Sequence, residues 1–238
     1  MEIEILWCDE DIILINKPAG LLTIRDGYDP SLPYIADILK SQYGKLFVVH
    51  RLDRDTSGIL LFARNAHSHR FLNEQFQNRQ TQKTYHAIIL GTPTWDEYHA
   101  EFPLQVDGDR RHRTKVEYVK GKPASTEFVV MERFANNCLV KALPQTGYTH
   151  QIRAHLLAVD FPLLSDPLYS TPSPSSATNS IYLPIEPQLI TRMALHAFSL
   201  SFIHPTSFRI FSLEASYPKD FQNTLDFLRK KLTNILVS

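Results

Sequence analysis

The chain has 238 residues, of which 43% are hydrophobic and 21% are charged, and these fractions are ordinary for a globular enzyme. Its 25 Lys and Arg residues balance its 25 Asp and Glu residues, whereas proteins that coat nucleic acid without specificity are usually strongly basic. The sequence has no run of about 18 apolar residues and therefore predicts no membrane span. Its acidic N-terminus does not resemble a signal peptide, and its two cysteines form no disulfide framework, so we expect a cytoplasmic protein with reduced thiols.

The first part of the sequence alternates between apolar strands and amphipathic helices. The strands expected here are 2–7, 11–16, 46–49 and 59–63. A helix is expected over 31–44, with Ser31 as its N-terminal cap and Gly44 at its end. A second helix is expected over 66–77, with Asn65 as its cap.

The rest of the sequence predicts a β-rich middle and a helical end. The strands expected here are 83–90, 113–119, 124–134, 138–144, 194–205 and 207–215. A helical period appears in 146–159 with Thr149 as the expected cap, Pro218 starts a last helix, and the Ser- and Pro-rich segment 170–180 predicts a mobile loop. This order predicts an α+β fold, with a mixed, mostly antiparallel sheet and flanking helices, in a single domain over 1–238.

The stretch between the apolar runs 46–49 and 59–63 is densely charged. Its ionisable side chains are His50, Arg51, Asp53, Arg54 and Asp55. One interpretation is a surface loop whose ion pairs contribute about 0–1 kcal/mol each. The other is an active site, in which Arg153 faces Asp53 and keeps this carboxylate ionised in a partly desolvated cleft. An ionised carboxylate suits a nucleophile or a base rather than a general acid.

One segment is basic although the whole chain is neutral. Residues 109–122 contain six Lys or Arg residues and two acidic ones. The arginines of this segment are Arg110, Arg111 and Arg113. Together with His50, Arg51 and Arg54, they suit contacts with a phosphate backbone.

Seven motifs follow one another along the chain and read INKPAGLLT, HRLDRDTSGILLFAR, KTYHAII, GKPASTEF, TGYTHQIRAHL, SDPLY and LHAFSLSFIHP. In this order they resemble the RluA-type family of RNA pseudouridine synthases. The resemblance spans residues about 3 to 213, which is nearly the whole chain.

The resemblance implies the pseudouridine synthase fold with a central active-site cleft, and isomerisation of uridine to pseudouridine in ribosomal or transfer RNA. Asp53 falls on the family's catalytic aspartate, which attacks or deprotonates the ribose of a flipped-out uridine. Arg51 falls on the arginine that enters the RNA stack, and Tyr85 on the aromatic residue that stacks on the uracil. Arg153 falls on the arginine that pairs with the catalytic carboxylate.

The resemblance also implies a monomer that needs no cofactor or metal and lacks the N-terminal RNA-binding module of many relatives. Two positions depart from the family pattern. Tyr148 stands where relatives have an arginine, and Ser165 and Ser170 replace the glycines that flank DPLY in relatives. The change at Tyr148 is either the loss of a peripheral contact or an altered contact with RNA.

Two other functional classes stay open at this stage. Asp53 and Asp55 are neighbouring carboxylates, as a glycosidic-bond hydrolase requires, although such enzymes hold the two groups about 5–9 Å apart and keep one protonated. A non-catalytic RNA-binding protein would use the basic residues alone. Loss of isomerisation in Asp53→Asn with intact RNA affinity would support the synthase, and detection of a free base product would instead favour the hydrolase.

Overall fold

The computed structural model describes residues 3–169 and 190–237, and the chain divides into two compact units. Unit 1 contains Met1–Tyr85 and His196–Ser216, and unit 2 contains His86–Leu195 and Tyr217–Ser238. The loop predicted at 170–180 lies outside the described residues. The single domain predicted over 1–238 stays a prediction.

Unit 1 is a sheet with helices around it. Its strands are β1 (Glu4–Cys8), β2 (Ile12–Lys17), β3 (Phe47–Val48), β4 (Ser57–Ala63), β11 (Leu195–Ile203) and β12 (Ile210–Glu214). Its helices are α1 (Ile35–Ile38), α2 (Lys40–Tyr43) and α3 (Ala66–Gln77). The strands predicted in this part of the chain are confirmed, and the one at 46–49 shortens to β3.

Strand β4 lies at the centre of the unit 1 sheet. The strand order is β1-β2-β4-β11, with β12 on β11 and β3 on β4. Among the described residues of this unit, the pairings are antiparallel except for the parallel pair of β4 and β11. All 7 residues of β4 are buried, which fits the continuous apolar run of a strand that is covered on both faces.

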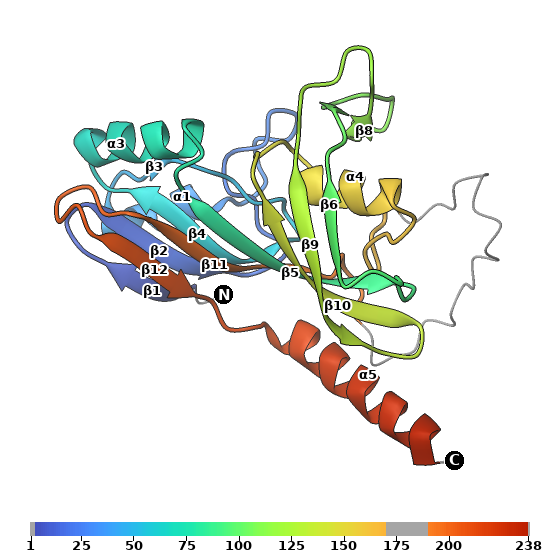
Figure 1. Cartoon of the computed structure of the whole chain (residues 1–238). Coiled ribbons are helices and arrows are strands. Elements are labelled where there is room, and N and C mark those ends of the chain that lie inside the picture. Colours follow the sequence, from blue (N-terminus) through green and yellow to red (C-terminus); the bar gives the residue numbers. More distant parts are fainter. Residues whose placement is uncertain (1–2, 170–189, 238) are drawn as a thin grey trace. The chain divides into compact units, whose positions relative to one another are not determined.

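Helix α3 confirms the helix predicted over 66–77 at both ends. The side chain of Asn65 accepts a hydrogen bond from the backbone N–H of Ser68 at 2.8 Å, so Asn65 is the predicted cap. Leu72 is completely buried on the inner side of the helix. Figure 1 shows α3 lying along one face of the unit 1 strands.

The helix predicted over 31–44 is instead two single turns, α1 and α2, and the prediction of Ser31 as its cap is wrong. Tyr34 precedes the first turn. Pro33 disfavours a helical conformation for the residue before it, so the helix begins only after the proline. Gly44 ends α2 with φ of 73°, as predicted.

Unit 2 contains a sheet in which β9 pairs antiparallel with both β10 and β6, together with two further helices. Its strands are β5 (Gln82–Leu90, whose first residues belong to unit 1), β6 (Glu97–Ala100), β7 (Leu104–Gln105), β8 (Lys115–Val116), β9 (Thr126–Arg133) and β10 (Asn137–Pro144). Its helices are α4 (Gln151–Ala158) and α5 (Lys219–Val237). The strand order is β5-β10-β9-β6, and β7 pairs with β8 separately. The sequence did not predict β6 and β7, and the strand expected over 113–119 shortens to β8.

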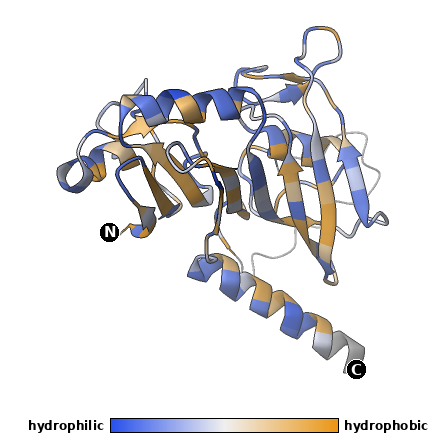
Figure 2. Ribbon diagram, turned by 60° about the vertical axis from the view of Figure 1, so that its left-hand side comes forward, coloured by the Kyte–Doolittle hydropathy of each residue, from blue (hydrophilic) through white to orange (hydrophobic). Residues whose placement is uncertain are grey.

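Unit 2 contains the helices α4 and α5. Residues Phe221, Leu225 and Leu228 of α5 are buried in one apolar cluster, and Figure 2 shows the alternation of apolar and polar sides along this helix. The prediction that Thr149 caps α4 is wrong, because His150 occupies that position with a left-handed φ of 56°. None of the helices in the described ranges is long and apolar enough to cross a membrane.

Candidate active site

The backbone of the charged stretch is fixed by groups inside unit 1. The hydroxyl of Thr23 donates to the carbonyl of Leu52 at 3.1 Å and accepts from the Leu52 N–H at 3.2 Å. The carbonyl of Arg54 accepts from the Nζ of Lys17 at 2.9 Å and from the N–H of Gly20 at 2.9 Å. The anchoring side chains are buried, Thr23 at 3% exposure and Lys17 at 0%. The backbone on both sides of residue 53 is therefore held in place.

Arg51 and Asp53 lie between these anchors. Arg51 is exposed, and within residues 3–169 and 190–237 no hydrogen bond or ion pair holds its side chain. Asp53 is half-buried, and its carbonyl accepts from the N–H of Thr56 at 3.1 Å, which closes a turn. The stretch thus presents a partly accessible carboxylate and an exposed cation on a fixed backbone.

His50 begins the stretch and packs within unit 1. Its ring stacks on Phe76 with centroids 4.9 Å apart, and its Nε2 accepts from the N–H of Leu61 at 3.0 Å. Burial, and then the charge of Lys83, lower the pKa of His50 to about 3. A neutral ring with a committed acceptor nitrogen anchors the backbone, and the RNA contact predicted for His50 stays a prediction.

The stretch ends in an exposed ion pair and a glycine. Arg54 Nε lies 3.3 Å from the Oδ1 of Asp55. Gly58 follows with φ of 112°, and a Cβ there would lie 2.2 Å from the carbonyl oxygen of Ala197 on β11. Only glycine permits this close pairing of β4 with β11.

Tyr85 lies on the part of β5 that belongs to unit 1 and packs against the core of that unit. Burial, and then the negative charge of Asp53, raise the pKa of Tyr85 above its ordinary value. The carboxylate and the phenol therefore share one electrostatic environment. Tyr85 stays neutral and offers an aromatic face together with a hydroxyl group.

Arg153 lies on the first turn of α4 in unit 2 and is 4% exposed. Its Nε donates to Asp166 Oδ2 at 2.7 Å, and its Nη2 donates to Asp166 Oδ1 at 2.8 Å. The pairing of Arg153 with Asp53 stays a prediction, since these two residues belong to different units.

The start of α4 is anchored through Gln151, whose amide is 3% exposed. Its Nε2 donates to the carbonyl of Ser125 and to the hydroxyl of Thr126, each at 3.0 Å. Its Oε1 accepts from the hydroxyl of Thr146 at 2.7 Å and from the N–H of Tyr148 at 3.2 Å. These bonds tie the helix that carries Arg153 to β9.

Comparison with known proteins identifies the family. The model of the RNA pseudouridylate synthase family matches residues 11–158. The chain is 35% identical over 204 residues to the dual-specificity RNA pseudouridine synthase RluA of Pasteurella multocida, across 85% of this chain and 88% of that protein. The chain belongs to the RNA pseudouridylate synthase family. The matched span contains the loop of Asp53, strand β5 with Tyr85, and Arg153, but not Asp166.

Two further pseudouridine synthase relatives agree with this assignment. The ribosomal large subunit pseudouridine synthase D of Neisseria meningitidis serogroup B is 33% identical over 241 residues, and the alignment covers 96% of this chain and 62% of that protein. The solved structure of the human RNA pseudouridylate synthase domain containing 4 is 26% identical with a TM-score of 0.73, across 95% of this chain and 93% of that one. The pseudouridine synthase fold predicted from the motifs is thus confirmed.

The basic segment of this pseudouridine synthase uses two of its three arginines within unit 2. Arg113 donates from Nε to Asp109 at 2.7 Å and from Nη1 to the carbonyl of Leu168 at 3.2 Å. Arg111 donates to the carbonyl of Pro167 at 3.4 Å. Arg110 is exposed, and its side chain has no hydrogen-bond or ion-pair partner among the described residues. Of the three, Arg110 is the one available to an RNA phosphate without breaking a bond.

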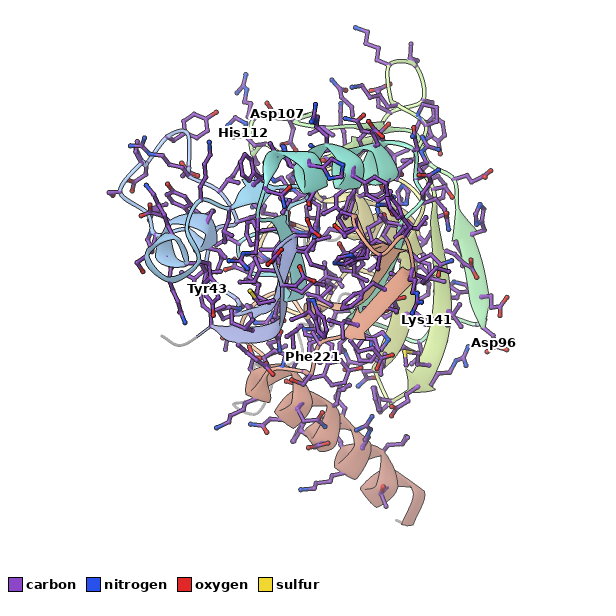
Figure 3. The ribbon with its side chains drawn as sticks, turned by 90° about the vertical axis from the view of Figure 1, so that its left-hand side faces the viewer. Tyr43, Asp96, Asp107, His112, Lys141 and Phe221 are labelled. Atoms are coloured by element: carbon purple, nitrogen blue, oxygen red, sulfur yellow. The ribbon has the colours of Figure 1, made fainter. Side chains whose placement is uncertain are left out.

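A neighbouring turn of the same segment is held by His112, whose Nδ1 lies 2.6 Å from the Oδ1 of Asp107. Figure 3 shows these two labelled side chains next to each other.

Tyr148, the departure from the family pattern, packs against an apolar cluster that includes Leu104, Ala154 and Tyr169. The tyrosine at this position therefore contributes to the packing of unit 2.

One group of described residues has the spacing of metal ligands, namely Asp9, Asp11 and His204, whose ligand atoms lie within 4.8 Å of one another. The Oδ1 of Asp9 accepts from two backbone N–H groups, and its Oδ2 lies 3.0 Å from His204 Nε2. Asp11 accepts from the hydroxyls of Ser68 and Thr206. These oxygens serve a hydrogen-bond network that joins β1 and β2 to α3 and to the β11–β12 turn.

Sequence reasoning missed Lys17 and Asp166. Lys17 ends the apolar strand IILINK, and Asp166 stands in the apolar run FPLLSDPLY, so each is an isolated charge in a buried sequence. A buried charge needs a partner, and this is the signal that points to both residues. The partner itself is a long-range feature that the sequence does not show.

Proposed function

We propose that this protein isomerises uridine to pseudouridine in a structured RNA, with Asp53 as its catalytic carboxylate. The observation that carries the proposal is a half-buried aspartate on a backbone fixed at both neighbouring residues, in a chain of the pseudouridylate synthase family. Fixed placement matters because a reacting group held in position avoids the entropy of being brought to its target.

The proposed reaction needs only acid–base and nucleophilic chemistry. The bond between uracil N1 and ribose C1′ breaks, the base turns, and a new bond joins C5 to C1′. The hydrogen at C5 leaves as a proton while N1 gains one, so the product has the atoms of the substrate. Asp53 either bonds to C1′ during the exchange or removes the 2′ proton of the ribose. No electron acceptor or external electrophile enters this balance, which supports a reaction without a cofactor.

Tyr85 and Arg51 are proposed to handle the extruded nucleotide. Extrusion from a stacked RNA costs a few kcal/mol, and stacking on an aromatic ring returns about 1–3 kcal/mol. Tyr85 suits this role because its phenol stays neutral, and because the charge of Asp53 contributes to the raised pKa of that phenol. Arg51 suits insertion into the RNA because its long cationic side chain is exposed. Arg153 is proposed to orient the reacting carboxylate.

The RNA backbone is proposed to contact cations near the loop and on the basic segment. Arg54 is exposed although paired with Asp55, and Arg110 is exposed with no partner in the described ranges. The sequence adds His50, Arg111 and Arg113 to this set, although each of them also forms a hydrogen bond within the protein.

The target is proposed to be ribosomal or transfer RNA. One relative is named a dual-specificity RNA pseudouridine synthase and another a ribosomal large subunit pseudouridine synthase. Mapping pseudouridines in total RNA from cells with and without this protein identifies the site.

We further propose that the protein acts in the cytoplasm as a monomer without a metal. Its two cysteines, Cys8 and Cys138, are unpaired, which is compatible with a reducing compartment.

Asp53→Asn tests the proposal. With RNA that carries tritium at uracil C5, the wild-type protein should release tritium to water, and the variant should release it at least about 10³-fold more slowly. Affinity for the same RNA should change little, since the exchange removes charge without volume. Asp55→Asn is the matched control and should keep wild-type turnover.

The two alternatives give different results in the same assay. A hydrolase would liberate free uracil from the RNA and would lose activity in Asp55→Asn as well as in Asp53→Asn. A non-catalytic RNA-binding protein would release no tritium in any form. Wild-type turnover in Asp53→Asn would reject the proposal.

A further inference from the structure

The SDPLY segment provides a buried partner for Arg153. The two side chains form two parallel hydrogen bonds of 2.7 and 2.8 Å, and their exposed fractions are 4% for Arg153 and 0% for Asp166. A side-on pair of this kind fixes the plane of the guanidinium as well as its position. The SDPLY motif alone assigned no role to Asp166.

The carboxylate of Asp166 is itself held by the chain around it. Its Oδ1 also accepts from the backbone N–H groups of Leu168 at 2.9 Å and Tyr169 at 3.2 Å. The ring of Tyr169 lies against Arg153, with 4.8 Å between the guanidinium carbon and the ring centroid. The Tyr169 hydroxyl accepts from the N–H of Thr114 at 2.8 Å and donates to the Thr114 carbonyl at 3.0 Å. Arg153 is thus enclosed on one edge by a carboxylate and on one face by an aromatic ring.

This enclosure is poorly explained by stability alone. Two charges taken out of water lose about as much hydration as they gain in attraction, and apolar replacements of a buried ion pair are often neutral or stabilising. The pair therefore adds little stability, but it does hold the guanidinium in a single orientation. The pair commits Nε–H and one Nη2–H to Asp166, so a second acceptor meets the other Nη2–H or the two Nη1–H donors.

We propose that Asp166 is a positioning residue that fixes the guanidinium of Arg153 in the orientation the reaction requires, with the ring of Tyr169 supporting it. The inference rests on the proposed function, in which Arg153 orients the reacting carboxylate. Asp166 acts through Arg153 and does not touch the substrate. Misplacing a group by about 1 Å is enough to slow a reaction about 10²-fold.

A double-mutant cycle on kcat tests this role. Asp166→Asn should lower kcat about 10²-fold and leave the KM for RNA within about twofold of wild type, because substrate binding does not depend on the guanidinium plane. Arg153→Met should lower kcat at least as much. The double variant should be no slower than Arg153→Met alone, since a residue that acts only through Arg153 has nothing left to position. Kinetics are measured below the unfolding temperature of every variant.

The control is a second side-on pair in unit 2, whose carboxylate is exposed. Arg192 donates to Asp220 at 2.7 and 3.1 Å, but Asp220 is 44% exposed. Asp220→Asn should keep wild-type kcat. If Asp166→Asn does not fold, Asp166→Glu keeps the charge but shifts the carboxylate, and its kcat should also fall.

Each outcome has a separate meaning. Wild-type kcat in a folded Asp166→Asn or Asp166→Glu variant would overturn the positioning role. A double variant much slower than Arg153→Met would show that Asp166 acts independently of the arginine, which also overturns it. Absence of pseudouridine formation by the wild-type protein would reject the proposed function itself, whatever the variants do.

Discussion

Lys17 shows how one buried cation can hold the backbone of the candidate active site. Its Nζ donates to the carbonyls of Pro18 at 2.8 Å, Leu21 at 2.8 Å and Arg54 at 2.9 Å. An ammonium group has three N–H donors, and three backbone acceptors match this number. The side chain thereby joins the turn after β2 to the loop that carries Asp53. These three carbonyls replace the water that a lysine with no exposed surface has lost.

Lys17→Met should therefore lower the free energy of unfolding by at least about 2 kcal/mol, because buried carbonyls that lose a donor cost about 1–3 kcal/mol each. Urea unfolding followed by circular dichroism measures the change. Lys40→Met, at an exposed position of α2, should stay within about 0.5 kcal/mol of wild type. Equal stability of the Lys17 and Lys40 variants would show that the three bonds contribute nothing.

At the scale of elements, the parallel contact of β4 with β11 depends on one glycine. His196 and Ala197 lie opposite Ser57 and Gly58 in the register of this pair. The approach is so close that a side chain at Gly58 would meet the backbone of Ala197. The pairing brings the end of the charged stretch against a strand that is far away in sequence.

Gly20 and Gly58 both have a positive φ, but only at Gly58 would an added Cβ also clash with the backbone. Comparing the two positions therefore separates the cost of the clash from the cost of the unfavourable φ. Gly58 has φ of 112° and a blocked Cβ position, whereas Gly20 has φ of 86° and nothing within 4 Å of a Cβ. Gly20→Ala should cost about 1–2 kcal/mol from its φ alone. Gly58→Ala should cost clearly more, because backbone atoms of a core strand must also move. Thermal unfolding compares the two, and a Gly58 variant as stable as the Gly20 variant would contradict the close approach.

Elements with local signals were predictable and those with long-range causes were not. The bounds of α3 follow from the cap at Asn65 and an apolar period, and both are local. Strands β6 and β7 carry little apolar pattern of their own and exist through pairing with β9 and β8. At the site, the motif indicates Asp53, but the partner of Arg153 depends on a segment beyond the helix. Ion-pair partners are set by tertiary structure, so Asp166 became visible only in three dimensions.

For the whole molecule, burial and hydrogen bonding bias several groups toward losing protons on folding. The pKa of His50 falls to about 3 and that of His155 is also lowered, in both cases chiefly by burial. Hydrogen bonds from Ser68 and Thr206 outweigh burial at Asp11 and lower its pKa to about 2. At acid pH the unfolded chain therefore binds more protons than the folded one, and stability falls as pH falls.

The pH range in which each group affects stability follows from the shift in its pKa. The contribution of His50 is complete above its unfolded pKa of about 6.5 and is lost as pH falls toward 3, and that of Asp11 is lost between about 3.8 and 2. His50→Gln, whose amide oxygen can still accept from Leu61, should reduce the slope of unfolding free energy between pH 4 and 6 by at most about 1.4 kcal/mol per pH unit. His67→Gln changes an exposed histidine on α3 and should leave the slope unchanged. Urea titrations at several pH values measure the slope, and parallel lines for the wild-type and His50→Gln proteins would show that His50 takes up its proton equally in both states.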